Sequence, residues 1–120
     1  MIYETLTYAV DHNVAVITLN RPTVMNALNS QMRAEITDAV GQAGQAARVV
    51  VLTGSGRAFC SGQDLGAEGN FADIDLERTL KDEYVPMLKA ITECPVPTIS
   101  AVNGPAAGAG ANLALAADVV

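Results

Sequence analysis

The sequence predicts a single α/β domain, and three observations lead to that prediction. Short runs of apolar, often β-branched residues at positions 14–19, 49–53 and 98–102 are typical of buried strands. Between these runs lie longer segments whose apolar residues recur every three or four positions, as on one face of a helix. Half of the 120 residues are hydrophobic, which is enough to build one core. Strands and helices that alternate along a chain are typical of the α/β class.

Two strand-like runs at the start of the chain predict an antiparallel hairpin. Positions 3–10 alternate roughly between apolar and polar residues, as a half-buried strand does. Asp11, His12 and Asn13 are residue types typical of turns, and the apolar run 14–19 follows them directly. We therefore expect strands at 3–10 and 14–19, joined by a tight turn.

A helix and a buried strand are predicted next. Asn29 or Ser30 can cap a helix that ends near Gly44, because side chains of these types accept hydrogen bonds from free helix amides. The apolar residues at helical spacing are Met32, Ile36, Ala39, Val40 and Ala43. The unbroken apolar run 49–53 predicts a strand covered on both faces of its sheet, and the glycines of 54–56 end it.

The second half of the chain predicts a loop, a helix, a strand and a further helix. Positions 66–73 contain glycines, small residues and charges without a clear period, which indicates a mobile loop. The amphipathic helix that follows has its apolar residues at Leu76, Leu80, Tyr84, Met87, Leu88 and Ile91. Pro86 predicts a kink or break in this helix, and the two prolines of 95–97 stop it. A buried strand at 98–102 and an alanine-rich helix at 108–117 follow.

The charge balance argues against nucleic acid as a partner. With 13 acidic and 7 basic side chains the formal net charge is −6, and no cluster of lysines and arginines supplies the charge that phosphate binding requires. The first residues lack the features of a secretion signal, and no apolar run is long enough to span a membrane. We therefore expect no membrane association and a cytoplasmic location.

The cysteines and the single histidine suggest neither a disulfide nor a metal site. In a chain this apolar, Cys60 and Cys94 are expected to be reduced thiols. Together with His12 they form no spacing typical of metal ligands. We expect no metal in this part of the protein.

Two glycine-containing stretches carry the functional signal. The segments 58–65 (AFCSGQDL) and 103–110 (NGPAAGAG) each follow a predicted strand and supply bare backbone rather than a reactive side chain. Two convergent backbone N–H groups in a dry site stabilise an oxyanion, and small residues let a substrate approach them closely. The sequence therefore predicts a site that polarises a carbonyl group.

Two other kinds of chemistry fit these stretches poorly. A nucleophilic Ser61 would need the Gly-x-Ser-x-Gly elbow, but Phe59 and Gln63 occupy the glycine positions and His12 lies in a predicted turn. The second stretch suggests a dinucleotide fingerprint, but Leu113 stands where that motif has its third glycine. Either stretch taken singly could also be a tight turn that only needs small residues.

The two stretches resemble, in their order and spacing, the two halves of the oxyanion hole of the crotonase (enoyl-CoA hydratase/isomerase) family. The segment 20–28 (NRPTVMNAL) also matches the family, and the resemblance extends from about Ile2 to Val120. It implies a crotonase-like spiral of repeated ββα units. Residues 1–120 would be the N-terminal part of its acyl-CoA-binding core, because family members are longer. It also implies a homo-oligomer, either a trimer or a hexamer.

The resemblance assigns the candidate site residues. The oxyanion amides would be those of Ser61 and Ala109, and the latter lies near a helix start, where amides lack internal partners. The backbone that binds coenzyme A would be contributed by Ala27, Ser61, Gly62, Gln63, Asp64 and Leu65. No separate cofactor is implied, because coenzyme A is part of the acyl-CoA substrate.

Several further residues have both a functional and a structural interpretation. Arg21 and Arg57 are candidate phosphate contacts, with a solvated surface position as the alternative. Asp64 either contacts the ligand or braces the turn through local hydrogen bonds. Candidate walls of an acyl pocket, or plain core residues, are Phe71, Ile74, Leu76 and Leu80.

Asn112 departs from the pattern of family members that hydrate enoyl-CoA, which have a glutamate at this position. An amide cannot exchange a proton near neutral pH, so it cannot serve as one of two acid/base carboxylates. The third motif is most similar to the branch that contains 1,2-epoxyphenylacetyl-CoA isomerase. The expected function is therefore acyl-CoA isomerisation, with its carboxylate after Val120, and Asp118 as a lesser candidate. The alternatives are a hydratase with altered catalytic groups and a non-catalytic piece with a binding or assembly role.

Overall fold

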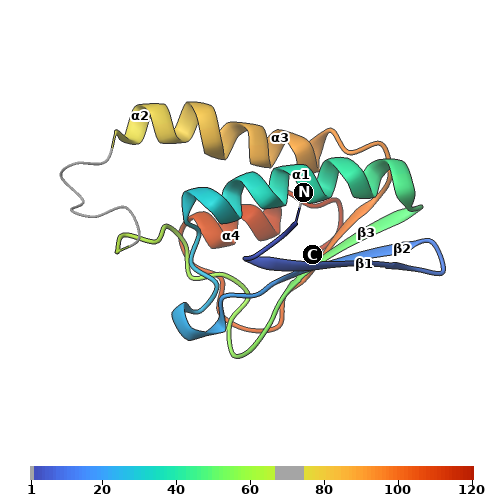
Figure 1. The fold of residues 1–120 in the computed structure, drawn as a ribbon, viewed down its shortest axis with the longest axis horizontal. Helices are drawn as coiled ribbons and strands as arrows, with labels where there is room; N and C mark the ends of the chain where they lie inside the picture. Colours follow the sequence, from blue (N-terminus) through green and yellow to red (C-terminus); the bar gives the residue numbers. More distant parts are fainter. Residues whose placement is uncertain (1, 67–74) are drawn as a thin grey trace.

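A four-stranded mixed sheet forms the base of the structure. The computed structural model describes residues 2–66 and 75–120, and its strands are β1 (Leu6–Asp11), β2 (Val14–Leu19), β3 (Val49–Gly54) and β4 (Thr98–Ala101). Their order across the sheet is β1-β2-β3-β4, with β1 antiparallel to β2 and the other neighbours parallel (Figure 1). The predicted hairpin is confirmed. His12 and Asn13 turn it with φ angles of 50° and 65°, as a two-residue hairpin loop requires.

The helices gather on one face of this sheet. Helix α1 (Ser30–Ala46) contacts β1, β2 and β3, and α3 (Val85–Thr92) packs against α1, as Figure 1 shows. The predicted cap of α1 is Asn29, whose side chain accepts from the Met32 amide at 2.8 Å. The remaining helical elements are η1 (Pro22–Val24), α2 (Leu76–Thr79), η3 (Leu80–Tyr84) and α4 (Ala109–Leu115). Most of the predicted loop 66–73 lies outside the described residues.

Pro86 does not break its helix. The segments α2, η3 and α3 run on continuously from 76 to 92, but η3 is a π-helical turn in which the Val85 amide donates to the Leu80 carbonyl. A proline has no amide hydrogen, and its ring crowds the carbonyl four residues earlier, here that of Asp82. The wider π turn accommodates this conflict just before the proline, so the helix continues without the predicted break.

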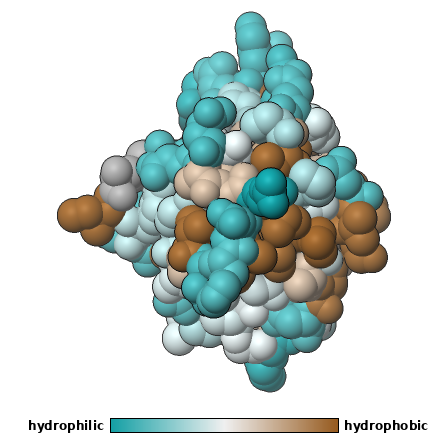
Figure 2. All heavy atoms as spheres, turned by 90° about the vertical axis from the view of Figure 1, so that its right-hand side faces the viewer, coloured by the Kyte–Doolittle hydropathy of each residue, from teal (hydrophilic) through white to brown (hydrophobic). Residues whose placement is uncertain are grey.

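The prediction that strand 49–53 is covered on both faces is wrong for the described residues. Val50 and Leu52 are buried toward the helices, whereas Val49, Val51 and Thr53 on the other face are only half-buried. Among the described residues, helices cover only one face of the sheet. Figure 2 views the end of the molecule that carries the β1–β2 turn and shows apolar surface, in brown, between polar areas.

A buried carboxylate fastens the start of the chain to α1. Glu35 is 2% exposed, and its Oε1 accepts from the amides of Glu4 and Thr5 and from the Thr5 hydroxyl, each at 2.9 Å. Gln31 donates to Oε2 at 2.9 Å. Burial alone raises the pKa of Glu35, but the hydrogen bonds from Thr5, Gln31 and Glu4 outweigh it, so the pKa lies below its ordinary value.

We expect Glu35→Gln to remove part of the dependence of stability on pH. Because the pKa of Glu35 is lower in the folded chain, its contribution is fully present above the unfolded value of about 4.3. The contribution is lost as the pH falls through the folded pKa. The variant should therefore be less stable than the wild type at pH 5–7, and the difference should shrink below about pH 4. Urea unfolding at several pH values measures this, with the exposed Glu93→Gln as the control. An unchanged difference at low pH would contradict the assignment.

Candidate functional site

The two glycine stretches lie side by side. The amides of Phe59 and Cys60 donate to the Pro105 carbonyl at 3.0 and 3.3 Å, and the Ala107 amide donates to the Cys60 carbonyl at 3.1 Å. Cys60 and Ala106 form a parallel bridge. Residues about 45 positions apart in the sequence are thereby joined backbone to backbone, because the parallel strands β3 and β4 end at the same edge of the sheet.

Three glycines leave no room for a side chain at this junction. A Cβ at Gly110 would lie 2.2 Å from the Cys60 carbonyl oxygen, and one at Gly104 would lie 2.0 Å from that of Arg57. Gly62 has a φ of +105°, and a Cβ there would lie 2.9 Å from the Ala107 carbonyl oxygen and 3.7 Å from the Ala109 nitrogen. The first motif therefore passes directly beside the Ala109 amide.

Asn26 holds the loop that leads into the first motif. It is fully buried, and its Nδ2 donates to the carbonyls of Ser55, Ala58 and Phe59 at 3.0, 3.0 and 3.2 Å. Its Oδ1 accepts from the Arg21 amide at 2.8 Å. With a φ of 57°, Asn26 adopts a backbone conformation that asparagine tolerates better than most residues.

Asn103 holds the same loop from the second motif. Its Oδ1 accepts from the Gly54 amide at 3.0 Å, and its Nδ2 donates to the carbonyls of Gly56 and Ala58 at 3.3 and 3.1 Å. Neither asparagine is among the site residues predicted from the sequence. Their position inside two of the three motifs could have indicated this role, because buried carbonyl groups of a loop need hydrogen-bond donors.

The two candidate oxyanion amides differ in their surroundings. Ala109 is the first residue of α4 and is half-buried, and no residue of the described ranges accepts from its amide. The Ser61 amide donates to the Met25 carbonyl at 3.0 Å, which differs from the expectation that both amides face a common cavity. Met25 has a φ of 54°, and its carbonyl lies against the first motif.

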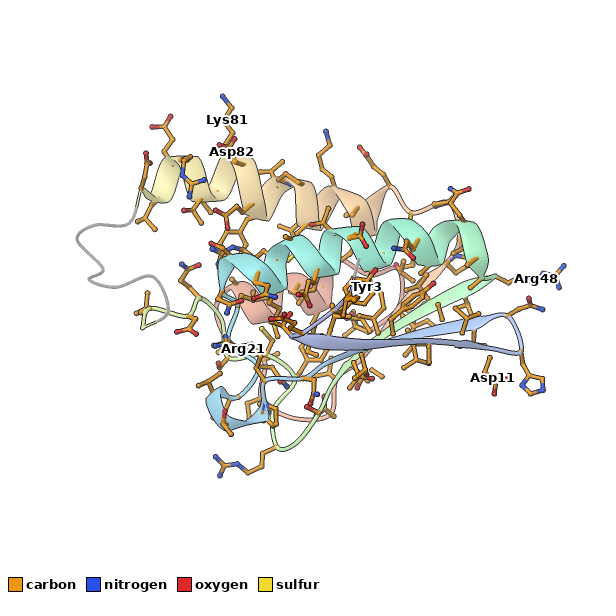
Figure 3. The ribbon with its side chains drawn as sticks, viewed as in Figure 1. Tyr3, Asp11, Arg21, Arg48, Lys81 and Asp82 are labelled. Carbon is orange, nitrogen blue, oxygen red and sulfur yellow. The ribbon has the colours of Figure 1, made fainter. Side chains whose placement is uncertain are left out.

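The nucleophile hypothesis for Ser61 finds no support in the geometry. The Ser61 hydroxyl donates to the Val24 carbonyl at 3.2 Å. His12 pairs with Asp11 at 2.9 Å in the exposed hairpin turn. Figure 3 shows Asp11 near the right-hand end of the molecule and Arg21, which pairs with Asp64 of the first motif, well to its left, so His12 beside Asp11 lies away from that motif.

The residues expected to bind coenzyme A are contiguous in space. The Leu28 amide donates to the Gly62 carbonyl at 2.7 Å, and the Asp64 amide donates to the Leu28 carbonyl at 2.9 Å, which pairs Leu28 with Gln63 in a parallel bridge. Ala27 is therefore next to the first motif. The structure brings together two segments that the sequence places more than thirty residues apart.

Asp64 and Arg21 brace this junction. Asp64 Oδ2 lies 2.9 Å from Arg21 Nη1, which also donates to the Ala27 carbonyl at 2.5 Å. Asp64 Oδ1 accepts from the Gly66 amide at 3.0 Å. These contacts agree with the bracing interpretation of Asp64 and engage the guanidinium of Arg21 within the protein. Arg57 is exposed at the end of the loop.

An apolar pocket is lined in part by Ala109. Its volume is about 240 Å³, and its lining residues are Gln63, Leu65, Leu76, Thr79, Leu80, Tyr84 and Ala109. Two candidate acyl-pocket residues, Leu76 and Leu80, line it, while Phe71 and Ile74 lie outside the described residues. A larger groove of about 430 Å³ runs between α1 and η3, but it includes no residue of the glycine motifs. The smaller pocket is therefore the candidate site.

Asn112 and Asp118 occupy different surroundings on and after α4. Asn112 is exposed and lies one helical turn after Ala109, on the same face. Asp118 Oδ2 accepts from the amide and hydroxyl of Thr98 at 2.9 and 3.2 Å, and that hydroxyl accepts from the Asp118 amide. Asp118 therefore braces the start of β4.

The described residues contain no cluster of histidine, cysteine and acidic side chains that could hold a metal ion. Nor does any helix among them have the length and apolar character needed to cross a membrane. Cys60 and Cys94 are free thiols. Burial raises the pKa of Cys60, although the Gly62 amide partly opposes this shift, so the thiol is protonated and unreactive at neutral pH.

Fold and site together define the class: an α/β protein whose candidate site consists of backbone groups beside an apolar pocket. Residues 9–120 match the Enoyl-CoA hydratase/isomerase family, and the chain belongs to that family. The family resemblance and the fold predicted from it are thereby confirmed.

Individual relatives carry both names of the family. A Rhodobacter capsulatus protein named "Probable enoyl-CoA hydratase" is 61% identical over 120 residues, which are 100% of this chain and 46% of that protein. The 1,2-epoxyphenylacetyl-CoA isomerase of Escherichia coli is 40% identical over 92% of this chain and 44% of its own length. The crystal structure of an enoyl-CoA hydratase/isomerase from Xanthobacter autotrophicus superposes with a TM-score of 0.88 at 38% identity. It is matched over 98% of this chain and 45% of that one. The chain thus spans about half the length of these relatives.

We expect Gly110→Ala to destabilise the junction of the two motifs. The added Cβ would force the Cys60 carbonyl away, at a cost of about 1–3 kcal/mol typical of overpacking. Gly41→Ala is the matched control, because nothing lies within 4 Å of a Cβ at that exposed helix position. It should stabilise the chain by about 0.5–1 kcal/mol. Urea unfolding compares the two, and equal midpoints would contradict the close approach.

Proposed function

We propose that residues 1–120 form the part of an acyl-CoA isomerase that binds the substrate and polarises its thioester carbonyl. The observation that carries this proposal is Ala109, which lines an apolar pocket and whose amide donates to no residue of the described ranges. A thioester oxygen accepting from this amide would also benefit from the start of α4, where the helix favours negative charge. The pocket would hold the acyl group.

Ser61 is proposed as the second oxyanion donor. In the described structure its amide donates to the Met25 carbonyl, so substrate binding would have to replace that bond with one to the thioester oxygen. Such an exchange costs little if the new acceptor carries more negative charge, as an enolate oxygen does. Support for this role comes from the family resemblance and from the proximity of Gly62 to the Ala109 nitrogen.

Coenzyme A would bind along the junction of the NRPTVMNAL segment and the first motif. The backbone of Ala27 lies next to residues 61–65 there, and the exposed Arg57 precedes the first motif in sequence and is a candidate contact for a phosphate. Coenzyme A enters as part of the substrate, so the proposed reaction uses no separate cofactor. We further propose that the whole protein is a cytoplasmic homo-oligomer, a trimer or a hexamer.

The proposed reaction moves one proton. A carboxylate outside residues 1–120 removes a proton beside the thioester carbonyl, and the electron pair of the broken C–H bond moves into the enolate that the amides stabilise. Return of a proton at another carbon shifts the double bond. The same polarised carbonyl would assist the rearrangement of 1,2-epoxyphenylacetyl-CoA, the substrate class of the Escherichia coli relative.

Hydration of enoyl-CoA is the second candidate function. The Rhodobacter capsulatus relative, at 61% identity, bears the name of a hydratase. Against this stands Asn112, an exposed amide one turn from Ala109, where proton transfer to water would need a carboxylate. Asn112 can still orient a water molecule or a polar group of the substrate.

Ala109→Pro in the whole protein should reduce kcat by about 10²–10³, the usual effect of losing one oxyanion donor. Proline removes the amide hydrogen but suits the first position of a helix, so α4 should form normally. Ser61→Ala keeps its amide and should remain near wild-type activity. Steady-state kinetics and circular dichroism measure both variants. Loss of activity in Ser61→Ala as complete as in Ala109→Pro would instead support a side-chain role for Ser61.

The whole protein should isomerise 3-hexenoyl-CoA or 1,2-epoxyphenylacetyl-CoA with a kcat/KM about 10² above that for hydration of crotonyl-CoA. The physical reason is the missing carboxylate at position 112. Asn112→Glu should raise hydration while its uncharged counterpart Asn112→Gln should not, which separates charge from size. Efficient hydration of crotonyl-CoA by the unmodified protein would overturn the isomerase proposal in favour of the hydratase.

A further inference from the structure

Arg33 is a fully buried arginine that the proposed chemistry does not use. It lies on α1, at 0% exposure, between the first glycine motif and the helix that runs from α2 to α3. Burying a guanidinium is costly even when it is paired, and an apolar side chain of similar size would serve stability as well. A contribution to stability therefore does not by itself explain why an arginine stands at this position.

One set of contacts fixes the motif side of the candidate pocket. Arg33 Nη1 donates to the Leu28 carbonyl at 2.9 Å and to Gln63 Oε1 at 3.1 Å. Leu28 is paired with Gln63 through the backbone bridge, so a single guanidinium nitrogen holds both the backbone and the side chain of this wall.

The other contacts fix the helical side. Arg33 Nε and Nη2 lie 2.9 and 2.8 Å from Glu83 Oε1, and Nη1 donates to the Tyr84 hydroxyl at 3.2 Å. The guanidinium carbon also lies 4.7 Å from the centre of the Tyr84 ring, and the Tyr84 hydroxyl donates to Gln63 Oε1. The planar fork of arginine makes these bonds at once, which lysine cannot do.

The π turn η3 is what directs these groups inward. Glu83 and Tyr84 are partly or fully buried against Arg33, while Lys81 on the same turn is exposed and points away from α1 in Figure 3. Leu76, Thr79, Leu80 and Tyr84 line the pocket from this helix, and Gln63, Leu65 and Ala109 line it from the motifs. The pocket is the space between two walls that Arg33 ties together.

We propose that Arg33 is a positioning residue that sets the separation of these two walls and thereby the bulk of the acyl group that the pocket accepts. This inference rests on the proposed function, since it takes the pocket to be the acyl site. Hydrogen bonds in two directions from one rigid, buried group leave the walls little freedom to move apart. The pocket should therefore favour a small acyl group over a bulky one.

The test is the affinity of the whole protein for coenzyme A, butyryl-CoA and phenylacetyl-CoA, measured by titration calorimetry. Tyr84→Phe keeps the ring but removes the hydroxyl through which the helical wall bonds to both Arg33 and Gln63. It should leave the Kd of coenzyme A unchanged and shift the Kd ratio of phenylacetyl-CoA to butyryl-CoA toward the bulkier ligand by about 3- to 10-fold, the effect of one net hydrogen bond. Arg33→Met should shift the ratio further, with its fold checked by near-UV circular dichroism.

Arg78→Met is the matched control. Arg78 also binds Glu83, at 3.0 Å from Oε2, but it is exposed and does not line the pocket. It should leave the Kd ratio unchanged. If the wild type does not bind coenzyme A, the proposed function itself fails. If the wild type binds all three ligands and Tyr84→Phe keeps the wild-type ratio, the role of Arg33 is refuted while the proposed function stands, even if Arg33→Met does not fold.

Discussion

The backbone contact between residues 59–60 and 105–107 is the constraint on which the candidate site depends. It brings the ends of β3 and β4 together without any side chain in between, and a Cβ at Gly104 or Gly110 would collide with a carbonyl oxygen. Backbone groups joined this closely cannot be hydrated, so the neighbouring loop obtains its hydrogen bonds from protein. Asn26 and Asn103 supply them. The glycines thus permit the close backbone contact, and the two asparagines supply hydrogen bonds to the carbonyl groups of the adjoining loop.

The proposed site made of backbone amides would explain why one family can carry the names of two activities. Any residue except proline at position 109 supplies an amide, and stabilising an enolate would serve isomerisation and hydration alike. The choice between them lies with proton-transferring side chains. In the proposed function Asn112, one turn beyond Ala109, disfavours hydration because it supplies no carboxylate there. Fold similarity to a hydratase or to an isomerase therefore cannot decide the reaction.

The two halves of the candidate pocket are built on different principles. The motif side is held by backbone pairing and close glycine contacts, whereas the helical side is held through side chains that meet at Arg33. Glu83 illustrates the second principle. Burial raises the pKa of Glu83. Hydrogen bonds from Arg33, Ser30 and Arg78, together with the charge of Arg33, lower it by more, so the net pKa lies below its ordinary value and the carboxylate stays ionised as the partner of the guanidinium.

The sequence alone determined the local elements and the family. Turn residues at positions 11–13, the Asn29 cap and the apolar spacings specify the hairpin and α1, because these signals act within a few residues. The three motifs identify the family because their order and spacing are specific. The helix at 109–115 is slightly shorter than the predicted 108–117, as is usual for helix ends.

Only the tertiary structure decided how these elements complete one another. The hydrogen bond from Arg33 to Tyr84 joins residues 51 positions apart, and no periodicity of the sequence predicts it. The π turn before Pro86 and the engagement of the Ser61 amide by Met25 likewise depend on what the folded chain places nearby. Short-range patterns fix φ and ψ, whereas a buried polar group finds its partner only when distant segments have packed around it.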